Sequence, residues 1–273
     1  MGFDTKALRS RIKSVTSTLH LTKAMGLVAS SKIRRANEAM FRSKAYITAY
    51  HETMKILTAS RECANSPYMA DRGEGRTKIL VIAGDRGMAG GYNANVFRLA
   101  AEYPDAELIP IGKRACDRFG LKAEYGEAAI SSETYSSKAA VELSARLCAE
   151  FVEGSFDRLG VISTEYVSMM TQTAKITWLL PLQKEGSAEA RDTIFEPDEQ
   201  TVLQTVVPDY VAGRIMAAVR ESFASEVAAR RMAMDSAGRN AGEMLEDLSL
   251  QYNRARQGAI TQEITEIVAG SDT

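Results

Sequence analysis

Apolar and small residues repeat in alternating steps of four and three from Leu8 to Leu57, and this stripe constrains the fold more than any other feature. Such a rhythm places one continuous stripe along one side of a helix and is typical of a coiled coil. No stripe position is charged, and no proline occurs before Pro67. We therefore expect one unbroken helix from Asp4 or Thr5 to about Ser60, far longer than the ~10–14 residues of most globular helices. The stripe consists of Leu8, Ile12, Val15, Leu19, Thr22, Gly26, Ala29, Ile33, Ala36, Met40, Ser43, Ile47, Tyr50, Met54 and Leu57.

A second long helix is expected at the other end of the chain. All six prolines lie between Pro67 and Pro208, so the final segment lacks the strongest helix breaker. We place this helix from Pro208 to about Val268, with a less regular seam that includes Val227, Met234, Ala241 and Leu248. A lone amphipathic helix of this length would expose an apolar stripe that soluble proteins avoid. The two helices should therefore pair, and a domain between them would make the pair antiparallel.

The middle of the chain alternates short apolar runs with amphipathic segments, which predicts a largely parallel sheet with helical crossovers. The expected fold is thus an α/β, Rossmann-like middle domain plus a long antiparallel α-helical coiled coil formed by the N- and C-terminal helices. We expect three parts: a long helix over 1–66, the α/β domain over 67–207 and a long helix over 208–273. Strands are expected at 78–83, 108–111, 159–164 and 175–182, helices at 95–103, 113–119 and 137–156, and loops at 71–75 and 183–200.

Charge is balanced overall but uneven along the chain. The net charge is −1, with 45% hydrophobic and 25% charged residues, which argues for a folded protein without a general affinity for nucleic acid or membranes. Residues 1–60 carry eleven Lys or Arg against three acidic residues, so this segment is expected to face an acidic partner. No apolar run is long enough to span a membrane, and the three cysteines lack metal-ligand spacing. We expect no metal, no cofactor and no catalytic residue.

A glycine-rich loop follows the first expected strand and leads into a helix. Dinucleotide-binding folds place their phosphate site in this position, but the glycine spacing of the known phosphate motifs is absent. Two interpretations remain, a tight turn that contacts a partner and a phosphate-binding loop. The residues concerned are Asp85, Arg86, Gly87, Gly90, Gly91 and Asn93.

Two alternative functions follow from the same features. The loop and the α/β pattern would suit a nucleotide-binding α/β enzyme with helical extensions. The basic face of the first helix, around Lys32, Arg34 and Arg35, would suit a coiled-coil protein that binds nucleic acid. The polar end of the second helix, from Tyr252 to Val268, argues against both alternatives. It presents hydrogen-bonding groups on several sides, as a helix with partners on all sides would.

Three segments resemble the gamma subunit of F-type ATP synthases. The first lies between Leu8 and Arg35, the second is the glycine-rich loop, and the third lies between Ser225 and Ile264. Their matching residues include Thr22-Lys23-Ala24-Met25, Val28-Ala29, Ser31-Lys32, Asp85-Arg86-Gly87, Gly90-Gly91, Asn93, Ser225-Glu226, Ala228-Ala229-Arg230, Met234, Ala241-Gly242, Tyr252-Asn253, Ala255-Arg256-Gln257 and Ile260-Thr261-Gln262-Glu263-Ile264. The resemblance spans the chain and is strongest in the last segment.

The resemblance implies a central-stalk rotor subunit that couples rotation of the membrane c-ring to ATP synthesis or hydrolysis on the beta subunits. Its helical pair would lie inside a hexameric ring of alpha and beta subunits, and its α/β domain would contact the epsilon subunit and the c-ring. The subunit would be non-catalytic and peripheral, on the cytoplasmic face of the bacterial inner membrane or its organelle equivalent. Contact with the membrane would be only indirect, through the c-ring, and no nucleic acid would bind.

The resemblance also implies which positions couple rotation to catalysis, with Lys23 and Arg230 pairing with carboxylates of the beta subunits. Two positions depart from the family: Gly26 stands where a charged residue is usual, and Arg231 stands where methionine is usual. The implied coupling positions are Lys23, Met25, Arg230, Arg256, Gln257, Thr261, Gln262 and Glu263.

Overall fold

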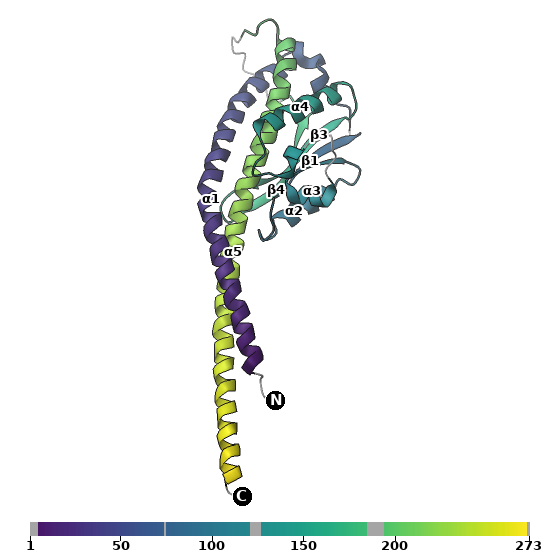
Figure 1. Cartoon of the computed structure of the whole chain (residues 1–273). Helices are drawn as coiled ribbons and strands as arrows, with labels where there is room; N and C mark the ends of the chain where they lie inside the picture. The colour runs from purple at the N-terminus through teal and green to yellow at the C-terminus, as the bar shows by residue number, and fades with distance from the viewer. Residues whose placement is uncertain (1–4, 74, 121–126, 185–193, 272–273) are drawn as a thin grey trace. The chain divides into compact units, whose positions relative to one another are not determined.

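The computed structural model describes residues 5–73, 75–120, 127–184 and 194–271. The chain forms two compact units, one of residues Ser31–Arg230 and one of Met1–Ser30 with Arg231–Thr273. Two long helices, α1 (Thr5–Ala59) and α5 (Glu199–Ser271), each contribute to both units (Figure 1). Among the described residues, no helix is long and apolar enough to cross a membrane.

Helix α1 confirms the long first helix that the sequence predicts. It has 55 residues and ends at Ala59, one residue before the expected position. All of the stripe positions between Leu8 and Leu57 are buried or half-buried, and none is exposed. The four-three rhythm therefore identifies the face that packs against other elements along the whole of α1. The alternative start, Asp4, lies outside the described residues.

Helix α5 begins earlier than expected. It starts at Glu199 rather than near Pro208, and Pro208 lies inside the helix. The cap is Asp198, whose Oδ1 accepts a hydrogen bond from the Thr201 amide at 2.8 Å, while its Oδ2 accepts one from the Thr201 hydroxyl at 2.8 Å. An aspartate in this position satisfies an amide at the helix start that has no partner within the helix. The expected loop at 183–200 therefore ends at the cap, and its residues 185–193 lie outside the described part of the chain.

The two long helices are antiparallel within each unit. In the unit Ser31–Arg230, the Lys44 ammonium pairs with Glu221 at 2.8 Å, and Gly213 packs against the side chains of Tyr46 and Ile47. In the other unit, Gly26 packs against Met234 and Gly238 packs against Thr22. In both units, residues with higher numbers on α1 contact residues with lower numbers on α5. This confirms the predicted antiparallel pair.

A four-stranded sheet has the order β2-β1-β3-β4. Strands β1 (Thr77–Ile82) and β2 (Glu107–Ile111) are parallel, as are β1 and β3 (Arg158–Tyr166). Strand β4 (Gln172–Leu180) runs antiparallel to β3 because only a few residues join them, too few for a crossover. Pro110 is tolerated because β2 lies at the sheet edge, where one side of the strand needs no partner. The largely parallel sheet is thus confirmed, with β4 as the exception.

Helices cover both faces of the sheet (Figure 1). Alternate residues of β1 divide between two cores: Leu80 and Ile82 face α1, α4 (Ser137–Val152) and α5, whereas Ile79 and Val81 face α2 and α3. Helices α2 (Tyr92–Ala100) and α3 (Lys113–Phe119) close the second face. Short 3-10 turns lie at Glu62–Asn65, Pro67–Met69 and Glu127–Ile130. Both faces of this sheet are therefore buried, as is usual where parallel strands predominate.

Candidate coupling surfaces on the long helices and the glycine-rich loop

Asp85 anchors the glycine-rich loop to the body of the α/β domain. Its carboxylate accepts hydrogen bonds from the amides of Lys113, Ser132 and Glu133 at 2.8–3.1 Å and from the Ser131 hydroxyl at 2.7 Å. Burial disfavours ionisation of this carboxyl group, but the hydrogen bonds outweigh burial and lower the pKa of Asp85. The loop is consequently fixed to the start of α3 and to the segment before α4.

Asn93 closes the loop from its other end. Its Oδ1 accepts a hydrogen bond from the Gly84 amide at 2.9 Å, and its Nδ2 donates to the Arg86 carbonyl at 3.3 Å. Met88 and Gly90 both have φ of 58°, a conformation that glycine adopts without strain and other residues rarely adopt. These bonds give the loop a defined shape, with Arg86 exposed and Met88 58% exposed.

Arg230 on α5 also holds the loop. Its guanidinium donates to the carbonyls of Arg86 and Gly87 at 3.3–3.4 Å and pairs with Glu226 one turn earlier on the same helix. The Arg230 side chain is only 12% exposed. Within this unit Arg230 therefore already has a carboxylate partner in its own chain, and its pairing with a beta subunit stays a prediction.

From the sequence, Glu226 was named only as a match to the family and was given no role, yet it lies at the centre of this contact. Its side chain is 2% exposed, and within the described part of the chain its Oε2 has no hydrogen-bond partner. Burial, only partly offset by Arg230, raises the pKa of Glu226. Gly84 makes room for the carboxylate, because a Cβ there would lie 2.6 Å from Glu226 Cδ. Besides the family match, the sequence signal was a glutamate four residues before an arginine, a spacing that is common on exposed helix faces.

The unit formed by residues 1–30 and 231–273 contains a groove of about 510 Å³ between its two helices. Lys23 lines it and is exposed, whereas Met25 is half-buried. The two departures from the family are neighbours here, since a Cβ at Gly26 would lie 3.2 Å from Arg231 Nη1. The Arg231 guanidinium thus lies close to the backbone of Gly26, in space that a larger side chain at this position would fill.

In the last turns of α5, every residue from 256 to 270 is exposed. The polar groups there bond mainly along the helix: the Thr261 hydroxyl donates to the Gln257 carbonyl at 2.9 Å, and Gln262 donates to Glu266 at 2.9 Å. Apolar side chains are exposed as well, and they are Ile260, Ile264, Ile267 and Val268. The expected cluster of Arg256, Gln257, Thr261, Gln262 and Glu263 therefore lies on a helical end that none of the described residues covers.

Comparison with known proteins decides the family. A family model described as ATP synthase matches residues 4–273. A gamma chain of ATP synthase from Ruminococcus albus is 39% identical, with 97% of each chain covered. The chain belongs to the ATP synthase gamma chain family. A sodium-ion-specific gamma chain from Acetobacterium woodii is 36% identical, over 100% of this chain and 99% of that one.

Solved structures support the same fold for this gamma family member. The rotor of the Euglena gracilis mitochondrial ATP synthase gives a TM-score of 0.62 at 16% identity, covering 94% of this chain and 98% of that one. The central stalk and c-ring of the Tetrahymena thermophila enzyme give a TM-score of 0.58 at 18% identity, with 80% and 99% covered. The protein is accordingly a gamma-type central-stalk subunit of an F-type ATP synthase, and its fold is that of the family.

Proposed function

We propose that this chain is the non-catalytic shaft of the synthase, with its helical pair enclosed by alternating alpha and beta subunits and ATP chemistry confined to the beta subunits. An asymmetric shaft makes chemically identical sites differ at any moment, because each site faces a different side of it. Shaft orientation and nucleotide occupancy then bias each other by one coupling free energy. Membership of the gamma family supports this role.

The observation that carries the proposal is the exposed end of α5. Extending the pairing of Gly26 with Met234 and of Thr22 with Gly238 puts Thr5, where α1 begins, opposite about residue 255. Beyond that point α5 has no partner helix among the described residues, yet it carries four exposed aliphatic side chains. Apolar surface of this kind marks a site that other chains cover.

We assign coupling to two groups of residues. Lys23, Met25 and Arg230 form the first, and Arg256, Gln257, Thr261, Gln262 and Glu263 form the second. The second group is accessible on the uncovered end of α5. In the first group, Lys23 is exposed and available for a partner carboxylate, whereas Arg230 acts through the loop that it holds.

The α/β domain is assigned to contacts outside the alpha–beta ring, with the epsilon subunit and the c-ring. The exposed residues of the glycine-rich loop, Arg86, Met88, Gly90 and Gly91, are its candidate partner contacts. The subunit would then be peripheral, on the cytoplasmic face of the inner membrane or the organelle equivalent, and would reach the membrane only through the c-ring.

Reconstitution with alpha and beta subunits tests the proposal. The chain should copurify with them, and ATPase activity of the mixture should depend on its presence. Replacing Arg256 by alanine should lower that activity by about tenfold or more, since hydrogen bonds of charged groups are worth about 1.5–3 kcal/mol. Replacing Gln257 by alanine should lower it by a smaller factor, since hydrogen bonds of neutral groups are worth about 0.5–1.5 kcal/mol.

Arg61→Ala is the matched control, because Arg61 is also exposed but belongs to the other unit. It should leave activity unchanged. Full activity of both the Arg256 and the Gln257 variants would remove these residues from the coupling set, and ATPase activity independent of the chain would refute the rotor role.

A further inference from the structure

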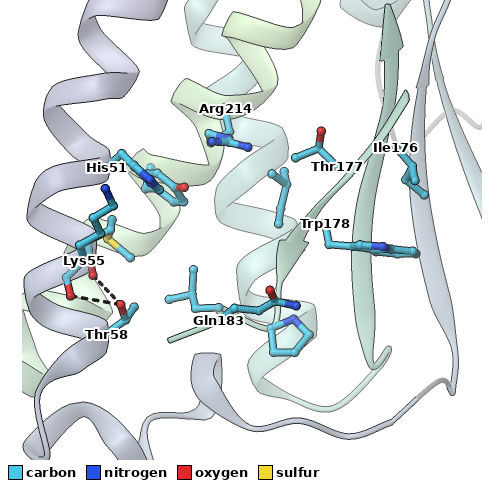
Figure 2. A pocket seen from close by; sticks show the side chains of 13 residues that line it. His51, Lys55, Thr58, Ile176, Thr177, Trp178, Gln183 and Arg214 are labelled. Carbon is cyan, nitrogen blue, oxygen red and sulfur yellow. Dashed lines mark hydrogen bonds between the residues drawn. The ribbon is translucent and has the colours of Figure 1, made fainter. Parts of the chain in front are cut away.

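A cavity of about 310 Å³ lies between α1, α5 and the end of β4, within the unit Ser31–Arg230 (Figure 2). Helix α1 contributes His51 and Lys55, and α5 contributes Tyr210 and Arg214. The rotor role leaves this cavity unexplained, because none of the coupling positions lines it.

The lining of the cavity carries charge of one sign. His51, Lys55 and Arg214 are basic, and none of the lining residues in the described part of the chain is acidic. Arg214 lies over the Tyr210 ring, with its Cζ 5.8 Å from the ring centroid, a contact that orients the guanidinium without neutralising it. Lys55 pairs with Glu52 at 3.3 Å, but both groups are about half exposed, so this bond is weak and easily exchanged.

Strand β4 contributes one hydroxyl group, that of Thr177, to a lining that also includes Ile176, Trp178 and Leu179. Figure 2 shows Thr177 pointing toward His51 and Arg214, whereas Ile176 and Trp178 point away from them. Trp178 is held on the other face of the sheet, where the Arg158 guanidinium lies 3.9 Å from its ring centroid. The alternation of β4 thus turns a hydroxyl group, rather than the indole, toward the basic side chains.

We propose that this cavity binds a phosphate group. Arginine offers a planar set of N–H donors that matches phosphate oxygens, and lysine adds a point charge. The Thr177 hydroxyl and the Gln183 amide add neutral donors for the remaining oxygens. The volume admits a phosphate with a small substituent, so the group could come from a free phosphate compound or from a lipid head group.

Equilibrium dialysis of the full-length chain with radiolabelled inorganic phosphate, at constant ionic strength, tests the site. Saturable binding at one site per chain is expected, and Arg214→Gln should weaken it by about tenfold or more, equivalent to about 1.4 kcal/mol. Lys55→Gln should weaken it less, because Lys55 offers a single point charge that already pairs with Glu52. Arg254→Gln removes the same charge from an exposed position outside the cavity and should bind as the parent does.

Vesicles distinguish the two sources. If the group belongs to a lipid, the chain should sediment with phosphatidylglycerol vesicles but not with phosphatidylcholine vesicles, and both Arg214→Gln and added phosphate should reduce sedimentation. Sedimentation that is absent or indifferent to Arg214→Gln, together with saturable phosphate binding, identifies a free phosphate compound. The proposal fails if phosphate does not saturate, if succinate binds equally well, or if folded Arg214→Gln and Lys55→Gln variants bind like the parent.

Discussion

Two carboxyl groups beside the glycine-rich loop have pKa values shifted in opposite directions. Asp85 accepts four hydrogen bonds, which stabilise its ionised form. Glu226 is buried with an oxygen that has no hydrogen-bond partner in the described part of the chain, which favours its neutral form. The loop therefore lies between Asp85, whose ionised form is stabilised, and Glu226, whose ionised form is destabilised by burial.

Asp85→Asn should destabilise the α/β domain by roughly 1.5–3 kcal/mol at neutral pH, because an amide cannot replace both acceptor oxygens of the carboxylate. Because the folded-state pKa of Asp85 is lowered, its stabilisation of the fold is fully present above the unfolded-state pKa of about 3.9. That stabilisation is lost as the pH falls through the folded-state pKa. Urea unfolding of parent and variant at several pH values measures this difference, which should shrink in acid.

Asp105→Asn is the control for Asp85, since Asp105 is exposed. Its unfolding free energy should match that of the parent at every pH. A loss as large as that of Asp85→Asn would show that the effect comes from net charge and not from the loop anchor.

Glu226→Gln should have the opposite pH behaviour. The folded-state pKa of Glu226 is raised. Its carboxyl group therefore contributes stability below the unfolded-state pKa of about 4.3, and that contribution is lost as the pH rises through the folded-state pKa. Glutamine does not ionise, and its oxygen can still accept from Arg230. The stability of the variant relative to the parent should therefore improve with pH, and an unfolding series showing the reverse would contradict a raised pKa.

The sequence predicted the loop at 85–93 but not the hydrogen bonds that hold it in place. Glycine and aspartate after a buried strand are a local signal, and they indicated a turn. The bonds from Ser131, Ser132 and Arg230 come from distant segments, which no spacing rule brings together. The role of Glu226 was missed for the same reason, because only the fold places Gly84 against it.

At the level of helices, the groove of the unit formed by residues 1–30 and 231–273 contains glycines in unlike surroundings. A Cβ at Gly242 would meet nothing within 4 Å, whereas a Cβ at Gly26 would meet Arg231 Nη1 at 3.2 Å. Gly242→Ala should stabilise the free chain by about 0.5–1 kcal/mol, the usual gain from replacing a helical glycine. Gly26→Ala should gain less, because Arg231 must move.

Thermal unfolding followed by helical circular dichroism compares the two glycine variants. The midpoint should rise more for Gly242→Ala than for Gly26→Ala. Equal shifts would mean that the Arg231 side chain does not restrict the space over Gly26.

Periodicity predicted both long helices and the end of α1, but not the start of α5. The stripe on α1 could be recognised because each of its positions packs against another element and therefore has a small or apolar side chain. The start of α5 was missed because Pro208 suggested a boundary. Asp198 caps the helix earlier in the chain, and Leu203 and Val207, which precede the proline, are buried in the core. The direction of β4 likewise depended on its short connection rather than on its own alternation.

On the scale of the whole chain, the two ends of the α5 seam differ in what covers them. Leu248 is 5% exposed and follows the heptad positions Val227, Met234 and Ala241, which are also buried. Ile264 is 56% exposed, beyond the reach of α1. Leu248 is thus covered within the chain, whereas the proposed rotor role has another subunit cover Ile264.

Leu248→Ala should therefore lower the unfolding free energy of the free chain by about 2 kcal/mol or more through the lost burial and the resulting cavity. Ile264→Ala should change it by less than about 0.5 kcal/mol, as is usual for exposed positions. In the reconstituted complex with alpha and beta subunits, Ile264→Ala should weaken assembly, measured as the fraction of chain that copurifies. If Ile264→Ala destabilised the free chain as much as Leu248→Ala, the end of α5 would be covered by its own chain. The argument that other subunits enclose it would then fail.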